Sequence, residues 1–169
     1  MVLGEVFTPP YLVQKMLDLV PPETWQDPSK TFLEPSCGNG NFVVAIIQRK
    51  IDSGSTLEQA LSTTFGVDID EMNVLECHER VRRLFALGDD ISLLAIVLNN
   101  IKLGDLLTAD SEGIVPFREL DTTQREVLLA NAARWISVGH SPDLLAPTVD
   151  KYSESSGKDQ ITGIFATGF

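Results

Sequence analysis

The chain has 169 residues, of which 43% are hydrophobic, and its formal net charge is −11 at pH 7. This size and composition predict one ordinary globular domain, while the charge argues against a chain that binds DNA, a polyanion, through a basic face of its own. No apolar run reaches the roughly 18 residues of a membrane span and no secretory signal pattern is found, so we expect a cytoplasmic protein without a membrane partner.

The N-terminal part of the chain predicts a helix, a strand and a second helix. Pro9-Pro10 is typical of a helix start, apolar residues then recur at helical spacing, and Pro21-Pro22 predicts the end of this helix. Residues 31–33 form a short apolar run that predicts the first strand. A turn over residues 36–41 and a buried helix over residues 42–49 are expected to follow.

Two further strands are predicted, each with a helix before it. Residues 55–58 have the pattern of a capping box that opens a short helix to about Leu61, and residues 64–69 predict the second strand. The third strand is predicted over residues 101–103. Strands that alternate with helices predict a parallel sheet with helical crossovers. The expected boundary residues of the two helices between these strands are Asp70, Gly88, Asp90 and Leu98.

The pattern weakens after Leu107. Residues 123–126 again resemble a capping box, and apolar residues at helical spacing predict a helix over residues 127–136. We expect this helix to cover the exposed edge of a truncated sheet, which would otherwise invite pairing with another strand. Residues 150–169 are rich in Ser, Gly, Thr and Lys and predict a mobile tail. The expected parts of the chain are an α/β domain, a helical extension and this tail, over residues 1–110, 111–149 and 150–169.

A glycine-bearing turn follows the first predicted strand. The strand ends at Glu34, and the turn contains Gly38 and Gly40. Because glycine lacks a Cβ atom, the backbone can turn tightly here and a ligand can approach it closely. Open α/β sheets bind ligands at the carboxyl ends of their strands, where Glu34 would suit a cationic group such as an ammonium. The turn lacks the G-x-G-x-x-G pattern and the lysine of a phosphate-binding loop, and an ordinary strand-to-helix turn is an equally strong interpretation.

Acidic residues also follow the second and third predicted strands. Asp68 stands where a carboxylate commonly accepts hydrogen bonds from ribose hydroxyls, and Asp70 is expected to cap the next helix. Asp105 could accept a hydrogen bond from an exocyclic amine, although such a turn is common by itself. Residues 4–11, ahead of the first helix, indicate only a helix start when they are taken alone.

Together and in this order, the four segments resemble the N-terminal, cofactor-binding part of the adenine-N6 DNA methyltransferases of restriction–modification systems. The family's opening motif resembles Phe7-Thr8-Pro9. Its first cofactor motif resembles residues 34–42, which read Glu-Pro-Ser-Cys-Gly-Asn-Gly-Asn-Phe. Its ribose-binding and adenine-binding motifs resemble residues 66–70 and Gly104-Asp105. The resemblance covers residues 4–107.

The resemblance implies a class I methyltransferase fold, which is an α/β, truncated Rossmann-like parallel sheet with helices on both faces. Its cofactor would be S-adenosyl-L-methionine, bound by residues 1–110. Glu34 would lie near the methionine moiety, Asp68 would bind the ribose hydroxyls and Asp105 the adenine amine. The implied cofactor-binding residues are Phe7, Thr8, Glu34, Pro35, Ser36, Cys37, Gly38, Gly40, Asp68, Ile69, Asp105 and Leu106.

The family's catalytic tetrad, Asn or Asp followed by Pro-Pro and Tyr or Phe, is not found after Asp105. Residues 106–117 contain one proline, and Ser141-Pro142-Asp143 lacks the second proline and the aromatic residue. Thr8-Pro9-Pro10-Tyr11 matches by letters but precedes the first strand, where the opening motif belongs. A DNA-reading domain is also missing. Catalytic residues are therefore unassigned, and contact with DNA is expected only through a partner chain that supplies the catalytic loop or the target recognition.

Other polar residues favour structural interpretations. Cys77-His78 would be a poor pair of metal ligands, because adjacent residues on a helix point in different directions, and we expect no metal site. Cys37 is interpreted as a small turn residue rather than as a reactive thiol. A solvated helix face, paired with nearby acidic residues, is expected for the basic cluster of Arg80, Arg82 and Arg83.

Three functions remain open from the sequence. The chain is a minimal or partner-dependent DNA adenine methyltransferase, a cofactor-binding remnant without catalysis, or an acidic interaction protein that binds or inhibits a host DNA methyltransferase or restriction complex. The intact cofactor motifs favour the first two functions, while the negative charge and the missing tetrad favour the last two. We also expect the substitution Asp68→Ala to abolish cofactor binding with little loss of stability.

Overall fold

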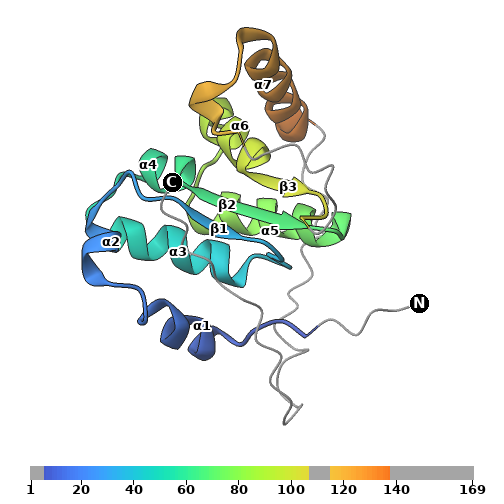
Figure 1. Cartoon of the computed structure of the whole chain (residues 1–169). Helices are drawn as coiled ribbons and strands as arrows, with labels where there is room; N and C mark the ends of the chain where they lie inside the picture. Colours follow the sequence, from blue (N-terminus) through green and yellow to red (C-terminus); the bar gives the residue numbers. More distant parts are fainter. Residues whose placement is uncertain (1–5, 107–114, 138–169) are drawn as a thin grey trace.

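The computed structural model describes residues 6–106 and 115–137 and forms an α/β structure with a three-stranded parallel sheet (Figure 1). The predicted tail and Ser141-Pro142-Asp143 lie outside the described residues. The strands are β1 (Phe32–Glu34), β2 (Thr64–Asp68) and β3 (Ile101–Leu103). The helices are α1 (Pro10–Leu17), α2 (Pro22–Gln26), α3 (Asn41–Asp52), α4 (Leu57–Ser62), α5 (Glu71–Leu84), α6 (Ile91–Asn100), the 3-10 helix η1 (Phe117–Glu119) and α7 (Thr122–Ser137).

The strands are arranged in the order β1-β2-β3, and both pairs are parallel. Glu34 pairs with Gly66, and Asp68 pairs with Leu103. This register places the carboxyl ends of all three strands at the same edge of the sheet. The acidic residues that end β1 and β2 are thereby brought onto neighbouring strands.

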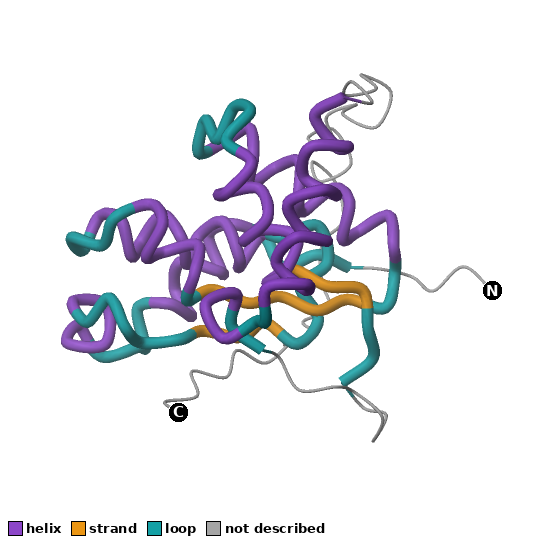
Figure 2. Tube along the Cα trace, turned by 90° about the horizontal axis from the view of Figure 1, so that it is seen from above, coloured by secondary structure: helices purple, strands orange, loops and turns teal. Residues whose placement is uncertain are grey.

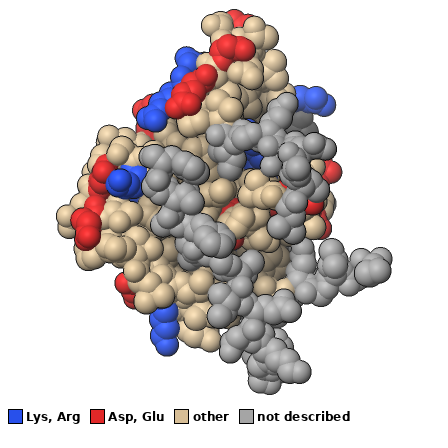
Figure 3. Space-filling model, viewed as in Figure 1, with Lys and Arg blue, Asp and Glu red and all other residues tan. Residues whose placement is uncertain are grey.

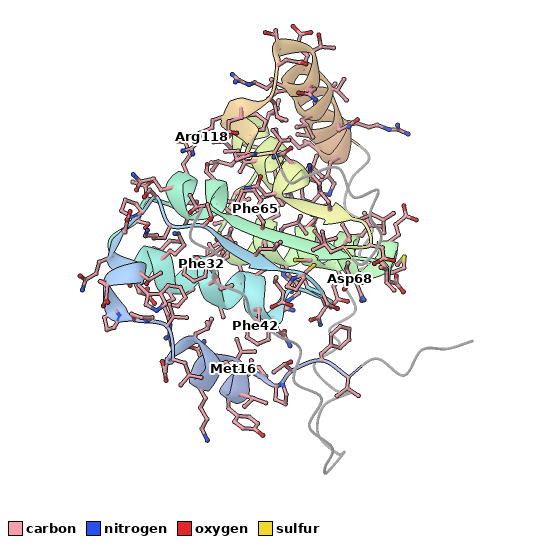
Figure 4. The ribbon with its side chains drawn as sticks, viewed as in Figure 1. Met16, Phe32, Phe42, Phe65, Asp68 and Arg118 are labelled. Carbon is pink, nitrogen blue, oxygen red and sulfur yellow. The ribbon has the colours of Figure 1, made fainter. Side chains whose placement is uncertain are left out.

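Two apolar clusters hold the described helices against the sheet. One contains side chains of α1, α2 and α3 with Phe32, and Figure 4 shows Phe32 and Phe42 close to Met16 of α1. The other contains side chains of α3 to α7 with Ile101. Phe32 pairs with Thr64, and Ile101 pairs with Gly66. Paired residues share a face of the sheet, as do alternate residues of one strand, so all four lie on the same face.

The opposite face of the sheet carries Phe65 and Val67. Both side chains are buried, but neither belongs to the two clusters. Figure 2 shows most of the helices on one side of the strands. The expectation of helices on both faces is therefore not met by the described residues, whose apolar clusters occupy one face.

Local signals in the sequence located most helix starts. Asp70 and Asp90 cap α5 and α6 as predicted, by accepting hydrogen bonds from backbone amides of the first turn. The two capping boxes are displaced from the predicted positions, because Thr56 and Asp121 provide the oxygen that accepts the amide. Each box is completed three residues later, where the Oε1 atom of a glutamine accepts a hydrogen bond from the backbone amide of the capping residue.

Two predicted helix boundaries are wrong. Pro21-Pro22 was expected to end the first helix, but α1 ends at Leu17 and Pro22 starts the short helix α2, where proline fits the first turn. The helix α5 ends at Leu84, before the expected Gly88, and Ala86 follows it with a positive φ of 50°. The Leu87 amide donates to the backbone oxygen of Arg82 at 2.9 Å and the Leu87 side chain is buried, and both contacts stabilise this helix end.

The helix α7 packs against α6 (Figure 1). Ala132 is fully buried in this contact region, and the Trp135 ring lies 5.8 Å from the His78 ring of α5. The apolar side of α7 therefore meets another helix, and its covering of a sheet edge stays a prediction. Among the described residues, no helix combines the length and the apolar character needed to cross a bilayer.

Candidate functional site at the carboxyl edge of the sheet

The glycine turn, residues 35–40, connects β1 to α3 and lies against the end of β2. The Cys37 amide donates to the Val67 oxygen at 2.9 Å, and the Gly40 amide donates back to the Cys37 oxygen at 2.8 Å. Gly38 and Gly40 have φ values of 50° and 92°, which disfavour residues with a side chain. A Cβ atom on Gly40 would also collide with Sγ of Cys77. Both glycines are therefore required by the local backbone.

Glu34 is fully buried at the end of β1, directly before the glycine turn. Its Oε1 accepts a hydrogen bond from the Ser36 amide at 3.3 Å, while Oε2 has no hydrogen-bond partner in the structure. Burial raises the pKa of Glu34 to about 8, the Ser36 amide opposes this effect, and the nearby Asp68 adds to it. A buried carboxyl oxygen without a partner is costly, so this position favours a ligand that donates a hydrogen bond or carries a positive charge.

Asp68 ends β2 and holds several backbone segments together. Its Oδ2 accepts from the Gly38 amide at 2.8 Å, and its Oδ1 accepts from the Asp70 amide at 2.9 Å and from the Asn73 side chain at 3.3 Å. A carboxylate accepts about four hydrogen bonds, so the geometry leaves room for about one more. Asp68 is only 6% exposed. The expectation that its removal would leave the stability intact conflicts with these three bonds.

Asp105 reaches the same edge from β3. The Gly104 amide donates to the backbone oxygen of Asp68 at 2.9 Å, and this bond fixes the start of the loop that carries Asp105. The Asp105 side chain is exposed, and Leu106 beside it is half-buried. Figure 4 shows Asp68 at this end of β2, with Phe65 farther back along the strand. The structure thus brings Glu34, Asp68 and Asp105 to three neighbouring strand ends.

The segment before α1 lies beside the glycine turn. Carbon atoms of the Phe7 ring stand 2.7 Å and 2.8 Å from the place where a Cβ atom of Gly38 would be. The backbone oxygen of Thr8 accepts a hydrogen bond from Nδ2 of Asn41 at 2.9 Å. The opening motif and the glycine turn, which are about thirty residues apart in the sequence, are therefore in contact, and no side chain larger than hydrogen fits at Gly38.

The remaining predicted site residues differ in accessibility. Ile69 is 64% exposed, Ser36 is exposed and Pro35 is half-buried. Cys37 is buried in the core, where a hydrogen bond with Cys77 and burial both raise the pKa of its thiol. A thiol with a raised pKa is a poor nucleophile, and this agrees with the interpretation of Cys37 as a turn residue.

Arg80 contacts the glycine turn, which no pattern in the sequence indicated. Its guanidinium donates to the Asn39 oxygen at 2.7 Å and to Oδ1 of Asn41 at 2.9 Å, so its expected placement on a solvated face is wrong. Arg82 does pair with acidic residues, at 3.6 Å from Glu79 and 3.2 Å from Asp89. No spacing rule distinguishes the two arginines, because the acceptors of Arg80 lie about forty residues earlier in the chain.

Metal binding finds no support in the part of the chain that the structure describes, where no group of three suitable side chains is found. Cys77 faces Gly40, while Nε2 of His78 lies 2.8 Å from the Ile101 oxygen, so the two side chains point apart as expected.

On the face shown in Figure 3, acidic and basic side chains are interspersed rather than gathered into one patch. Comparison with family models, with curated proteins and with solved structures found no match to this chain.

Proposed function

We propose that this chain binds S-adenosyl-L-methionine at the carboxyl edge of its sheet, and that it is related to the DNA adenine-N6 methyltransferases that its motifs resemble. The observation that carries the proposal is the buried, unpartnered Oε2 of Glu34 beside the glycine turn. An ammonium group bound here would favour the ionised form of Glu34, lower its pKa from about 8, and give this oxygen a partner.

The other acidic residues of the edge support the same ligand. Asp68 has room for about one further hydrogen bond, which suits one ribose hydroxyl, and we expect the exposed Asp105 to accept a hydrogen bond from the adenine amine. When bound, this cofactor supplies an activated methyl group. Because the catalytic tetrad is missing from the sequence after Asp105, we propose either a methyltransferase that depends on a partner chain for its catalytic loop and DNA recognition, or a remnant without catalysis.

Thermal melting with and without S-adenosyl-L-methionine tests the proposal. Ligand at about 100 times its Kd should stabilise the protein by about 2.7 kcal/mol if only the folded state binds. Glu34→Gln should reduce this stabilisation, whereas Glu58→Gln, the same change at an exposed position of α4, should not. If millimolar ligand leaves the melting temperature unchanged, the proposal is wrong. Methyl transfer to unmodified DNA then separates an enzyme from a remnant.

A second candidate function rests on the net charge of −11. An acidic interaction protein would bind or inhibit a host DNA methyltransferase or restriction complex through its negative surface. It would need neither Glu34 nor the glycine turn. Binding to such a complex that weakens with added salt, together with no response to S-adenosyl-L-methionine, would favour this function over the first.

A further inference from the structure

Arg80 connects α5 to the glycine turn through two acceptors. One nitrogen of its guanidinium, Nη1, donates both to the backbone oxygen of Asn39 and to Oδ1 of Asn41. The Nη1 nitrogen carries two hydrogens, so both hydrogen bonds can form at once. The last part of the glycine turn and the first residue of α3 are thereby held by a charged donor on a third element.

Asn41 extends this connection to the segment before α1. Because its Oδ1 accepts from Arg80, the orientation of the amide group is set, and Nδ2 is directed to the Thr8 oxygen. Phe7, next to Thr8, contacts Gly38 on the same turn. A single chain of bonds thus joins α5, the glycine turn and the segment before α1.

We propose that Arg80 is a positioning residue of the ligand site, which sets the geometry of the glycine turn and holds Phe7 and Thr8 beside it. The inference rests on the proposed binding of S-adenosyl-L-methionine. Arg80 acts through Asn39 and Asn41, and its loss leaves both acceptors without their charged donor. The helix α5 itself remains anchored by the buried side chains of Val74, Cys77 and Val81.

The test compares Arg80→Ala and Arg80→Lys with Arg83→Ala, which removes the same charge from an exposed position of α5. Calorimetric titration with S-adenosyl-L-methionine, at a temperature where all variants are folded, should give a Kd about tenfold weaker for Arg80→Ala. Arg80→Lys should recover part of the affinity, because lysine keeps a charged donor but not the planar geometry. Arg83→Ala should bind as the unsubstituted protein does.

Hydrogen exchange without ligand tests the effect of Arg80 on the glycine turn separately from the proposed function. Arg80→Ala should accelerate exchange of the backbone amides of residues 36–41, whereas Arg83→Ala should not. If the unsubstituted protein does not bind the cofactor, the proposed function fails, and the exchange rates still decide whether Arg80 sets the turn. Equal exchange in the two alanine variants, or equal Kd values for them, would overturn the inference.

Discussion

The backbone amide of Gly38 donates a hydrogen bond of 2.8 Å to Oδ2 of Asp68, and this bond joins the glycine turn to the end of β2 across thirty residues of sequence. Asp68 is also bonded to Asp70 and Asn73, so one carboxylate sets the shape of the carboxyl edge. The same residue is expected to contact a ribose hydroxyl, and its structural and binding roles must be separated by experiment.

Asp68→Ala should destabilise the fold by about 3 kcal/mol or more, because hydrogen bonds to a charged group contribute about 1.5–3 kcal/mol each and three donors lose their acceptor. Asp70→Ala is the matched control, since it removes a helix cap worth about 1 kcal/mol. Urea denaturation monitored by circular dichroism measures both changes. Equal losses in the two variants would contradict the structural role of Asp68.

Gly40→Ala should be much more destabilising than Gly54→Ala. Both glycines have positive φ values, 92° and 106°, so both substitutions carry backbone strain of about 1–2 kcal/mol. Only Gly40 has an atom in the way, Sγ of Cys77, whereas a Cβ on Gly54 meets nothing within 4 Å. The double variant Gly40→Ala/Cys77→Ala should regain part of the lost free energy of unfolding, and a double-mutant cycle with no coupling between the two positions would refute the collision.

Glu34→Gln should remove a pH dependence of stability at neutral pH. The pKa of Glu34 rises from an ordinary value of 4.5 to about 8 on folding, because burial disfavours its charged form. The stability that the protonated group contributes is fully present below pH 4.5 and is lost as the pH rises through about 8. Free energies of unfolding, measured in steps from pH 4.5 to 8.5, should fall more steeply for the unsubstituted protein than for the variant. Parallel curves would mean that Glu34 is ionised in the folded state.

Lys50→Met should flatten the stability profile at alkaline pH. Lys50 is fully buried, its Nζ donates to the Lys30 oxygen at 2.7 Å, and burial lowers its pKa from 10.5 to about 8. Between pH 8 and 10.5 the unfolded chain holds more protons than the folded one, so stability should increase with pH in that window. Lys30→Met removes an exposed lysine and keeps its carbonyl, so it should retain the increase. A variant Lys50→Met with an unchanged slope would show that another group is responsible.

Short-range patterns in the sequence predicted the strands and most helix starts. The apolar runs near Phe32 and Ile101 and the caps Asp70 and Asp90 depend on neighbours within a few residues, which a single sequence displays. The capping boxes at Thr56 and Asp121 were displaced by one or two residues because several adjacent side chains could serve as the cap. Boundaries of this kind are decided by which residue reaches the free amide.

By itself the sequence determined a parallel arrangement of three strands, a glycine turn after the first and an acidic residue after each, because these features follow from residue type and spacing. Only the tertiary structure decided how those groups are partnered. The bonds of Gly38 to Asp68 and of Arg80 to Asn39 cross thirty and forty-one residues, and the unpartnered oxygen of Glu34 is defined by what surrounds it. Such contacts depend on strand register and helix packing, which place distant residues within a hydrogen bond of each other.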